Sequence, residues 1–218
     1  MEIYKPDFKQ VYAVANELLL CASSIKTFPY SVTRMIEEMT DINCCSFKRA
    51  LSYGVDIRKF GSESAVIVDY GGRCIIFYND SQIDTRIRFS LLHELGHYIL
   101  NHEKDVKDVD LYKKQEVEAN SFAAQLLMPK QIIAEIQHRG KRVDENFLIK
   151  YFNVSKEAAI KRMESAYKFN SGYSIGKNID EWIILKYNIF IDYIIPKSKS
   201  IDWFEDEYER QRNRDKWL

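Results

Sequence analysis

Residues 91–100 read LLHELGHYIL, and this stretch places two histidines, His93 and His97, four positions apart. Residues four positions apart lie on the same face of a helix, so both imidazoles can bind one zinc ion. Glu94 follows the first histidine and could reach a water molecule at the zinc to act as its general base. Apolar residues on both sides predict a buried helix over about 85–101. The stretch therefore predicts a zinc site on a buried helix.

The residues that follow this stretch do not complete the site. His102 comes five positions after His97, about 140° around a helix, so we interpret it as a surface residue or a cation at the helix C-terminus. Leu100 and Glu103 occupy the positions where a metzincin has glycine and histidine, which excludes that class. The third ligand is therefore expected from another helix.

A second motif, KQEVEANSFAAQLLMP at residues 114–129, supplies that helix. Its stripe of small and apolar residues predicts one buried face over about 114–127. Glu116 lies at the edge of this stripe, whereas Glu118 lies about 200° away from Glu116 and nearer the outside. A carboxylate on a buried face is costly unless it is paired or binds a metal. The pattern therefore favours Glu116 as the third ligand, with Glu118 as the alternative.

The two motifs together, HELGHYIL and E-x-E-A-N-x-F-A-A-x-L-L-M-P, resemble the ImmA/IrrE family of bacterial zinc metallopeptidases. The resemblance covers about residues 64–167. It implies an α+β, zincin-like fold that is mainly helical, with a small antiparallel sheet or hairpin packed on the HEXXH helix. It also implies a zinc metalloendopeptidase with one zinc ion held by His93, His97 and a gluzincin-like third ligand, Glu116. Family members cleave or help to inactivate helix-turn-helix repressors of mobile elements, phages or stress regulons, so such a repressor is the expected partner.

A different class of function remains open, namely a regulatory module that keeps the zinc but acts by docking to its partner without proteolysis. The chain has 32 basic and 32 acidic residues and no net charge, which argues against a surface-wide basic field for nucleic acid. Residues 154–162 have some character of a helix-turn-helix, but a packing pair of helices is favoured. Direct DNA binding is therefore not expected.

A β-hairpin is predicted before the HEXXH helix, because two β-branched and aromatic runs, residues 64–70 and 73–78, flank Gly71-Gly72. We expect the substrate to pair with an exposed edge of residues 73–78. His138, Tyr98 and Tyr151 are candidate oxyanion donors, although His138 is better explained as a residue at a helix end.

The chain divides, on this interpretation, into a metallopeptidase domain at 1–169 and an extension of unknown role at 170–218. The domain comprises a helical lead-in over about 1–60 and a catalytic core over about 61–169. Further helices are predicted at about 8–22, 31–39, 46–53, 129–138, 145–151 and 155–167. A turn-rich boundary is predicted over 170–178, and the charged tail at 202–216 is expected to be a solvated helix.

The expected compartment is the cytoplasm, because MEIYKPDFKQ lacks the basic and then apolar run of a signal peptide. The longest early apolar segment is too short to span a membrane. The four cysteines form no CxxC pair, so we expect them to be small buried hydrophobic residues.

Overall fold

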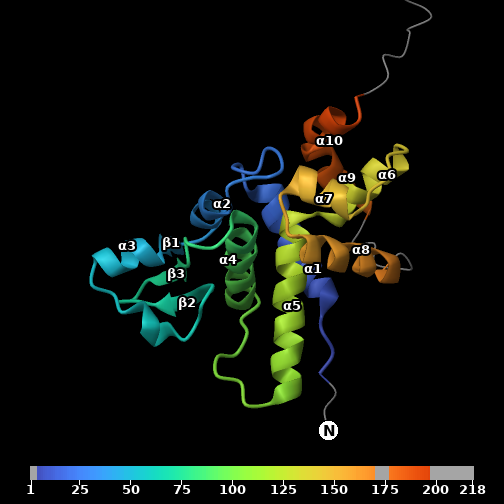
Figure 1. Ribbon diagram of the computed structural model, residues 1–218. Helices are drawn as coiled ribbons and strands as arrows, with labels where there is room; N and C mark the ends of the chain where they lie inside the picture. Colours follow the sequence, from blue (N-terminus) through green and yellow to red (C-terminus); the bar gives the residue numbers. More distant parts are fainter. Residues whose placement is uncertain (1–3, 170–176, 197–218) are drawn as a thin grey trace, which may run out of the picture.

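The computed structural model describes residues 4–169 and 177–196 (Figure 1). The helices in this part of the chain are α1 (Phe8–Cys21), α2 (Val32–Met39), α3 (Phe47–Ser52), α4 (Asp84–Ile99), α5 (Val109–Leu127), α6 (Lys130–His138), α7 (Glu145–Phe152), α8 (Lys156–Phe169), α9 (Lys177–Lys186) and α10 (Asn188–Ile194). The predicted helices are confirmed to within a few residues, except that α5 begins five residues early, where Asp108 caps it by accepting from Asp110 N and Leu111 N.

The small sheet confirms the α+β prediction and adds a strand to it. Strands β2 (Ala65–Asp69) and β3 (Cys74–Tyr78) form the predicted antiparallel hairpin, while β1 (Asn43–Ser46) pairs in parallel with the other edge of β3. The strand order is β1-β3-β2, so the sheet is mixed and β3 is its central strand. The expectation that a substrate pairs with residues 73–78 is wrong, because both edges of β3 are occupied.

Helix α4 lies between the sheet and the long helix α5, with α1 on the far side of α5 (Figure 1). The close approach of α4 and α5 depends on Gly96. A Cβ at this position would lie 3.1 Å from Phe122 Cδ1 and 3.2 Å from Ala119 Cα. Glycine therefore lets the HEXXH helix approach the backbone of α5, and Glu116 on α5 comes within reach of both histidines.

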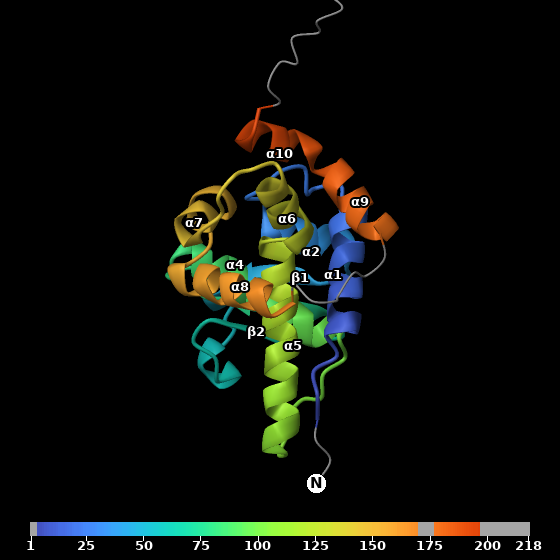
Figure 2. The ribbon, with the colours of Figure 1, turned by 90° about the vertical axis from the view of Figure 1, so that its right-hand side faces the viewer.

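Part of the extension belongs to the same hydrophobic core as the rest of the chain. Helix α9 packs on α1 and α6, and α10 packs on α6 (Figure 2). Lys186 Nζ donates to the carbonyls of Leu19 at 2.7 Å and Ala22 at 2.7 Å, and the Tyr187 hydroxyl donates to Leu19 O at 2.6 Å. These bonds satisfy carbonyls at the C-terminal end of α1. The predicted charged tail at 202–216, and the predicted boundary apart from residues 177 and 178, lie outside the described residues.

The structure also bears on the cysteines, on the helices around residues 154–162 and on membrane spans. All four cysteines are free; Cys44, Cys45 and Cys74 are half-buried and pack against hydrophobic clusters, whereas Cys21 is exposed, so the expectation of buried cysteines is wrong for Cys21. Helices α7 and α8 pack on each other, and Ala159 and Arg162 of α8 are buried. Within the described residues, no helix is both long enough and apolar enough to cross a membrane.

Candidate metal centre

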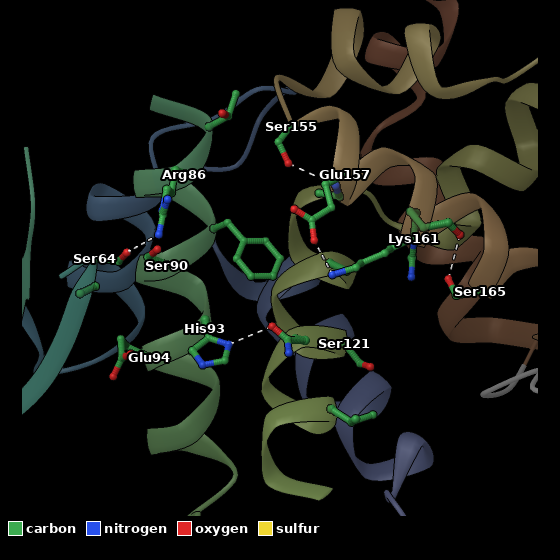
Figure 3. Close-up of a pocket in the computed structure, with 18 of the residues that line it drawn as sticks. Ser64, Arg86, Ser90, His93, Glu94, Ser121, Ser155, Glu157, Lys161 and Ser165 are labelled. Atoms are coloured by element: carbon green, nitrogen blue, oxygen red, sulfur yellow. Dashed lines mark hydrogen bonds and ion pairs between the residues drawn. The ribbon is translucent and has the colours of Figure 1, made fainter. Parts of the chain in front are cut away.

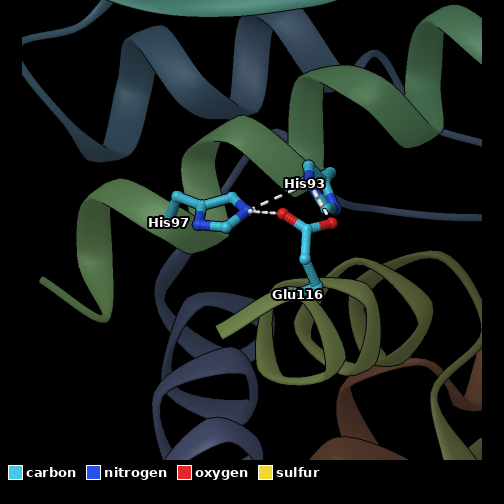
Figure 4. Close-up of side chains that lie close together, drawn as sticks. All are labelled: His93, His97 and Glu116. Carbon is cyan, nitrogen blue, oxygen red and sulfur yellow. Dashed lines mark hydrogen bonds and ion pairs between the residues drawn. The ribbon is translucent and has the colours of Figure 1, made fainter. Parts of the chain in front are cut away.

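His93, His97 and Glu116 meet between α4 and α5 (Figure 4). The Nε2 atoms of the two histidines lie 3.0 Å apart. Glu116 Oε1 lies 3.3 Å from His97 Nε2, and Glu116 Oε2 lies 3.6 Å from His93 Nε2. The structure thus brings together the three residues that the sequence favoured as zinc ligands.

The spacing and chemistry of these atoms fit a zinc ion. Adjacent ligands around a tetrahedral zinc with bonds of about 2.0–2.1 Å lie roughly 3.3 Å apart, close to the separations found here. Two imidazole nitrogens and one carboxylate oxygen form a common donor set for catalytic zinc. The pKa of His97 is lowered to about 3, mainly by burial and then by His93 and His102, so its ring is neutral at physiological pH. A neutral imidazole can present a lone pair to a metal.

Glu94 lies beside this group but faces the sheet. Its Oε2 accepts a hydrogen bond of 3.2 Å from the backbone N–H of Ile67 on β2. Burial raises the pKa of Glu94 to about 7, while the Ile67 hydrogen bond lowers it and Glu116 adds to the increase. A carboxyl group with a pKa near neutrality can both accept and donate a proton under physiological conditions.

Each of the two histidines has a partner at its Nδ1 atom. His93 Nδ1 lies 3.1 Å from Asn120 Oδ1, and His97 Nδ1 lies 3.0 Å from His102 Nδ1. Asn120 follows Glu116 by four residues, so it lies on the same face of α5 one turn later. That spacing is visible in the sequence and is the signal that could have indicated Asn120 as a residue of this site.

The interpretation of His102 as a surface residue is wrong. Helix α4 ends at Ile99, so the angle of a continuous helix does not apply to His102, which turns back onto His97. Its side chain is only 6% exposed. The placement of Glu118 nearer the outside is also wrong, since its side chain is likewise 6% exposed. The segment before α1 covers it, and Asp7 N donates to Glu118 Oε1 at 2.6 Å.

Burial therefore does not distinguish Glu116 as the ligand, because its side chain is 31% exposed and that of Glu118 only 6%. The contacts of Glu116 make it the candidate ligand, and Glu118 instead pairs with His102 at 3.1 Å. A contact between segments more than a hundred residues apart in the chain cannot be read from the periodicity of one helix.

A cleft of about 1030 Å³ runs past the site between α4, α5 and α8 (Figure 3). His93 and Glu94 line it together with Ala65 at the start of β2. On the opposite wall, Glu157 and Lys161 of α8 form an ion pair of 2.6 Å. The cleft is large enough for a stretch of polypeptide and reaches the group that could act as a base.

None of the three candidate oxyanion donors lines this cleft. His138 is 86% exposed and lies 3.9 Å from Glu135, which agrees with its interpretation as a residue at a helix end. The ring of Tyr151 packs against Phe147, and Tyr98 at the end of α4 is exposed.

Comparison with known proteins gives one family. The model of the IrrE N-terminal-like domain, peptidase family M78, matches residues 50–164, more than half of the chain. The match includes both motifs, the hairpin and the helices up to most of α8. No curated protein matches the chain.

Proposed function

The chain belongs to the IrrE N-terminal-like family of peptidases, and from this premise we propose that it is a zinc-dependent endopeptidase that makes a site-specific cut in a regulatory protein. The observation that carries the proposal is the convergence of His93, His97 and Glu116 within 4.8 Å of one another, beside a cleft lined by Glu94.

His93, His97 and Glu116 would hold the zinc ion. When bound, zinc supplies Lewis-acid polarisation of a peptide carbonyl and makes a water molecule more acidic. The two Nε2 atoms and the Glu116 carboxylate face one another, and Nδ1 of each histidine is turned toward a partner. The ligands are therefore pre-oriented by contacts on both sides.

Glu94 would carry the proton. Its carboxylate takes a proton from the attacking water and passes it to the leaving amine as the peptide bond breaks. The raised pKa of Glu94, about 7 in the metal-free protein, suits a group that must hold and release a proton in each cycle. Beside a bound zinc ion, Glu94 would have a lower pKa than in the metal-free protein, so its carboxylate form would be favoured and could accept the proton.

The substrate would lie along β2 rather than β3. Asn79 N donates to Ser64 O and Tyr70 N donates to Arg73 O, so alternation along the hairpin turns the backbone groups of Ala65, Ile67 and Asp69 away from β3. The bond from Ile67 N to Glu94 shows that this outer edge faces α4. An extended peptide pairing with it would pass directly beside Glu94.

The proposed substrate is a helix-turn-helix repressor of a mobile element, prophage or stress regulon, and the site of action is the cytoplasm. Support comes from the family resemblance and from a cleft large enough for a polypeptide. The balanced charge of the chain, 32 basic and 32 acidic residues, suits a protein partner better than a nucleic acid.

The test incubates the zinc-loaded protein with the repressor encoded beside its gene and measures fragment masses. Wild type should give two fragments, and Glu94→Gln should retain zinc and the fold but give none. Glu103→Gln, at an exposed glutamate, is the matched control and should cleave like wild type. Relief of repression by Glu94→Gln without any fragment would instead support the docking module and overturn the peptidase.

A further inference from the structure

A chain of partly buried hydrogen bonds leads from His97 to the N-terminal segment. His97 Nδ1 lies 3.0 Å from His102 Nδ1, and His102 Nε2 lies 3.1 Å from Glu118 Oε2. The other oxygen of Glu118 accepts from Asp7 N at 2.6 Å and lies 3.7 Å from Lys114 Nζ. Three separate parts of the chain therefore meet behind the metal-facing side of His97.

The position of each proton in this series of hydrogen bonds follows from which atoms can donate and which can accept. Both groups at Glu118 Oε1, the amide of Asp7 and the ammonium of Lys114, are donors, so the carboxylate of Glu118 acts as an acceptor. Its Oε2 then accepts the Nε2–H of His102. A neutral imidazole with a proton on Nε2 presents a lone pair at Nδ1. His97 must then place its own proton on Nδ1 to complete the contact of 3.0 Å.

This arrangement leaves Nε2 of His97 without a proton, on the side that faces His93 and Glu116. We propose that His102 and Glu118 are positioning residues that fix His97 in its Nδ1–H tautomer and so keep Nε2 available as a metal ligand. The inference rests on the proposed zinc site for its purpose. The tautomer itself is a property of the metal-free protein.

The N-terminal segment also contributes to the positioning of His97. Asp7 lies outside the region that matches the family model, residues 50–164, yet its backbone N–H is bonded to Glu118. The Nδ1 partner of His93 is instead Asn120, a residue of α5 inside the matched region. The lead-in of this chain therefore adds a support to His97 that the matched region does not supply alone.

The test compares two substitutions of similar size in the full-length protein. His102→Leu removes the acceptor that faces His97, whereas His102→Asn retains an oxygen near the position of Nδ1. His138→Leu, at an exposed histidine, is the control. Two quantities are measured: the tautomer of His97, from long-range nitrogen–proton NMR of the metal-free protein, and zinc affinity, from competition with a chelator.

Wild type should show His97 protonated at Nδ1, and His102→Leu should lose this preference. Zinc affinity should fall by about 10–100-fold in His102→Leu, as for other supporting residues behind a metal ligand. His102→Asn should recover most of that loss, and His138→Leu should not differ from wild type.

An Nε2–H tautomer of His97 in wild type would overturn the proposal, and so would unchanged zinc affinity in His102→Leu. If His102→Leu does not fold, the wild-type tautomer and the His102→Asn variant still decide the question. A wild-type protein that binds zinc but cuts no repressor would contradict the proposed function while leaving this inference standing. The proposed function and the positioning of His97 can therefore be contradicted separately.

Discussion

The backbone amide of Ile67 on β2 donates a hydrogen bond of 3.2 Å to the carboxylate of Glu94 on α4. This bond joins the edge of the sheet to the residue that would move the proton. It also fixes the direction in which Glu94 points, so the proposed base and the outer edge of β2 are held together.

The first prediction concerns the effect of pH on the metal-free protein. Burial raises the pKa of Glu94 from 4.5 to about 7, so the folded state favours its protonated form. The stability that Glu94 contributes is present below about pH 4.5 and is lost as the pH rises through about 7. Glu94→Gln cannot ionise, but its amide oxygen can still accept from Ile67 N. The variant should therefore match wild type in stability near pH 4.5 and be more stable at pH 8, by on the order of 3 kcal/mol.

Urea unfolding of both proteins at pH 4.5, 6 and 8, with a chelator present, measures this difference. Glu103→Gln, at an exposed glutamate, should show no such trend. A difference between Glu94→Gln and wild type that does not change with pH would contradict the raised pKa.

The second prediction concerns the third ligand. Glu116→Gln replaces one carboxylate oxygen of the donor set by a weak neutral ligand, and zinc affinity should fall at least about 100-fold. Glu118→Gln should weaken binding less, by about 10–100-fold, because Glu118 acts only through His102. Cobalt substitution separates the two roles, since the visible spectrum should change for Glu116→Gln and stay the same for Glu118→Gln. The reverse pattern would make Glu118 the ligand.

The third prediction concerns the contact between α4 and α5. In Gly96→Ala the new methyl group would lie 3.1 Å from Phe122 Cδ1 and 3.2 Å from Ala119 Cα. The Ala119 Cα belongs to the backbone, so it can move only if the whole helix shifts. The helices must separate by a few tenths of an ångström. Stability should fall by about 1–3 kcal/mol, and zinc affinity should fall with it. Lys113→Ala, an exposed position on α5, is the control, and a variant as stable as wild type would refute the close contact.

The fourth prediction concerns the outer edge of β2. Ala65→Pro removes an N–H that points away from β3, so the ladder between β2 and β3 keeps its hydrogen bonds. Cleavage of a peptide substrate should fall at least about tenfold, with little change in melting temperature. Val66→Pro, which removes a ladder donor, should instead destabilise the fold. Unchanged cleavage by Ala65→Pro would place the substrate elsewhere in the cleft.

The fifth prediction concerns the extension. Lys186→Met leaves the carbonyls of Leu19, Leu20 and Ala22 without their charged donor. Hydrogen bonds to charged groups contribute about 1.5–3 kcal/mol each at most, and the three share one donor, so a loss of about 2 kcal/mol is expected in chemical unfolding. Lys161→Met, at an exposed ion pair, should cost less than about 0.5 kcal/mol. Equal effects of the two substitutions would show that α9 does not cap α1.

Much of the fold could be predicted from the sequence, because periodicity and turn residues act locally. The eight helices predicted up to residue 169 and the hairpin around Gly71-Gly72 are all present. Strand β1 was missed, since four residues that include Cys44 and Cys45 carry no recognisable alternation. Its partner, β3, lies about 30 residues later in the chain, so no local pattern predicts the pairing that makes β3 central.

The sequence by itself determined the chemistry of the site: two histidines one turn apart, a glutamate beside the first, and a carboxylate on a second helix. Spacing within a helix is a local property, so His93, Glu94 and His97 could be identified without a structure. Only the tertiary structure decided the rest. Gly96 lets the two helices approach, the outer edge of β2 is bonded to Glu94, and the side chains of His102 and Glu118 lie buried behind His97. The burial of a side chain depends on what covers it, and Glu118 is covered by a segment 111 residues away in the chain.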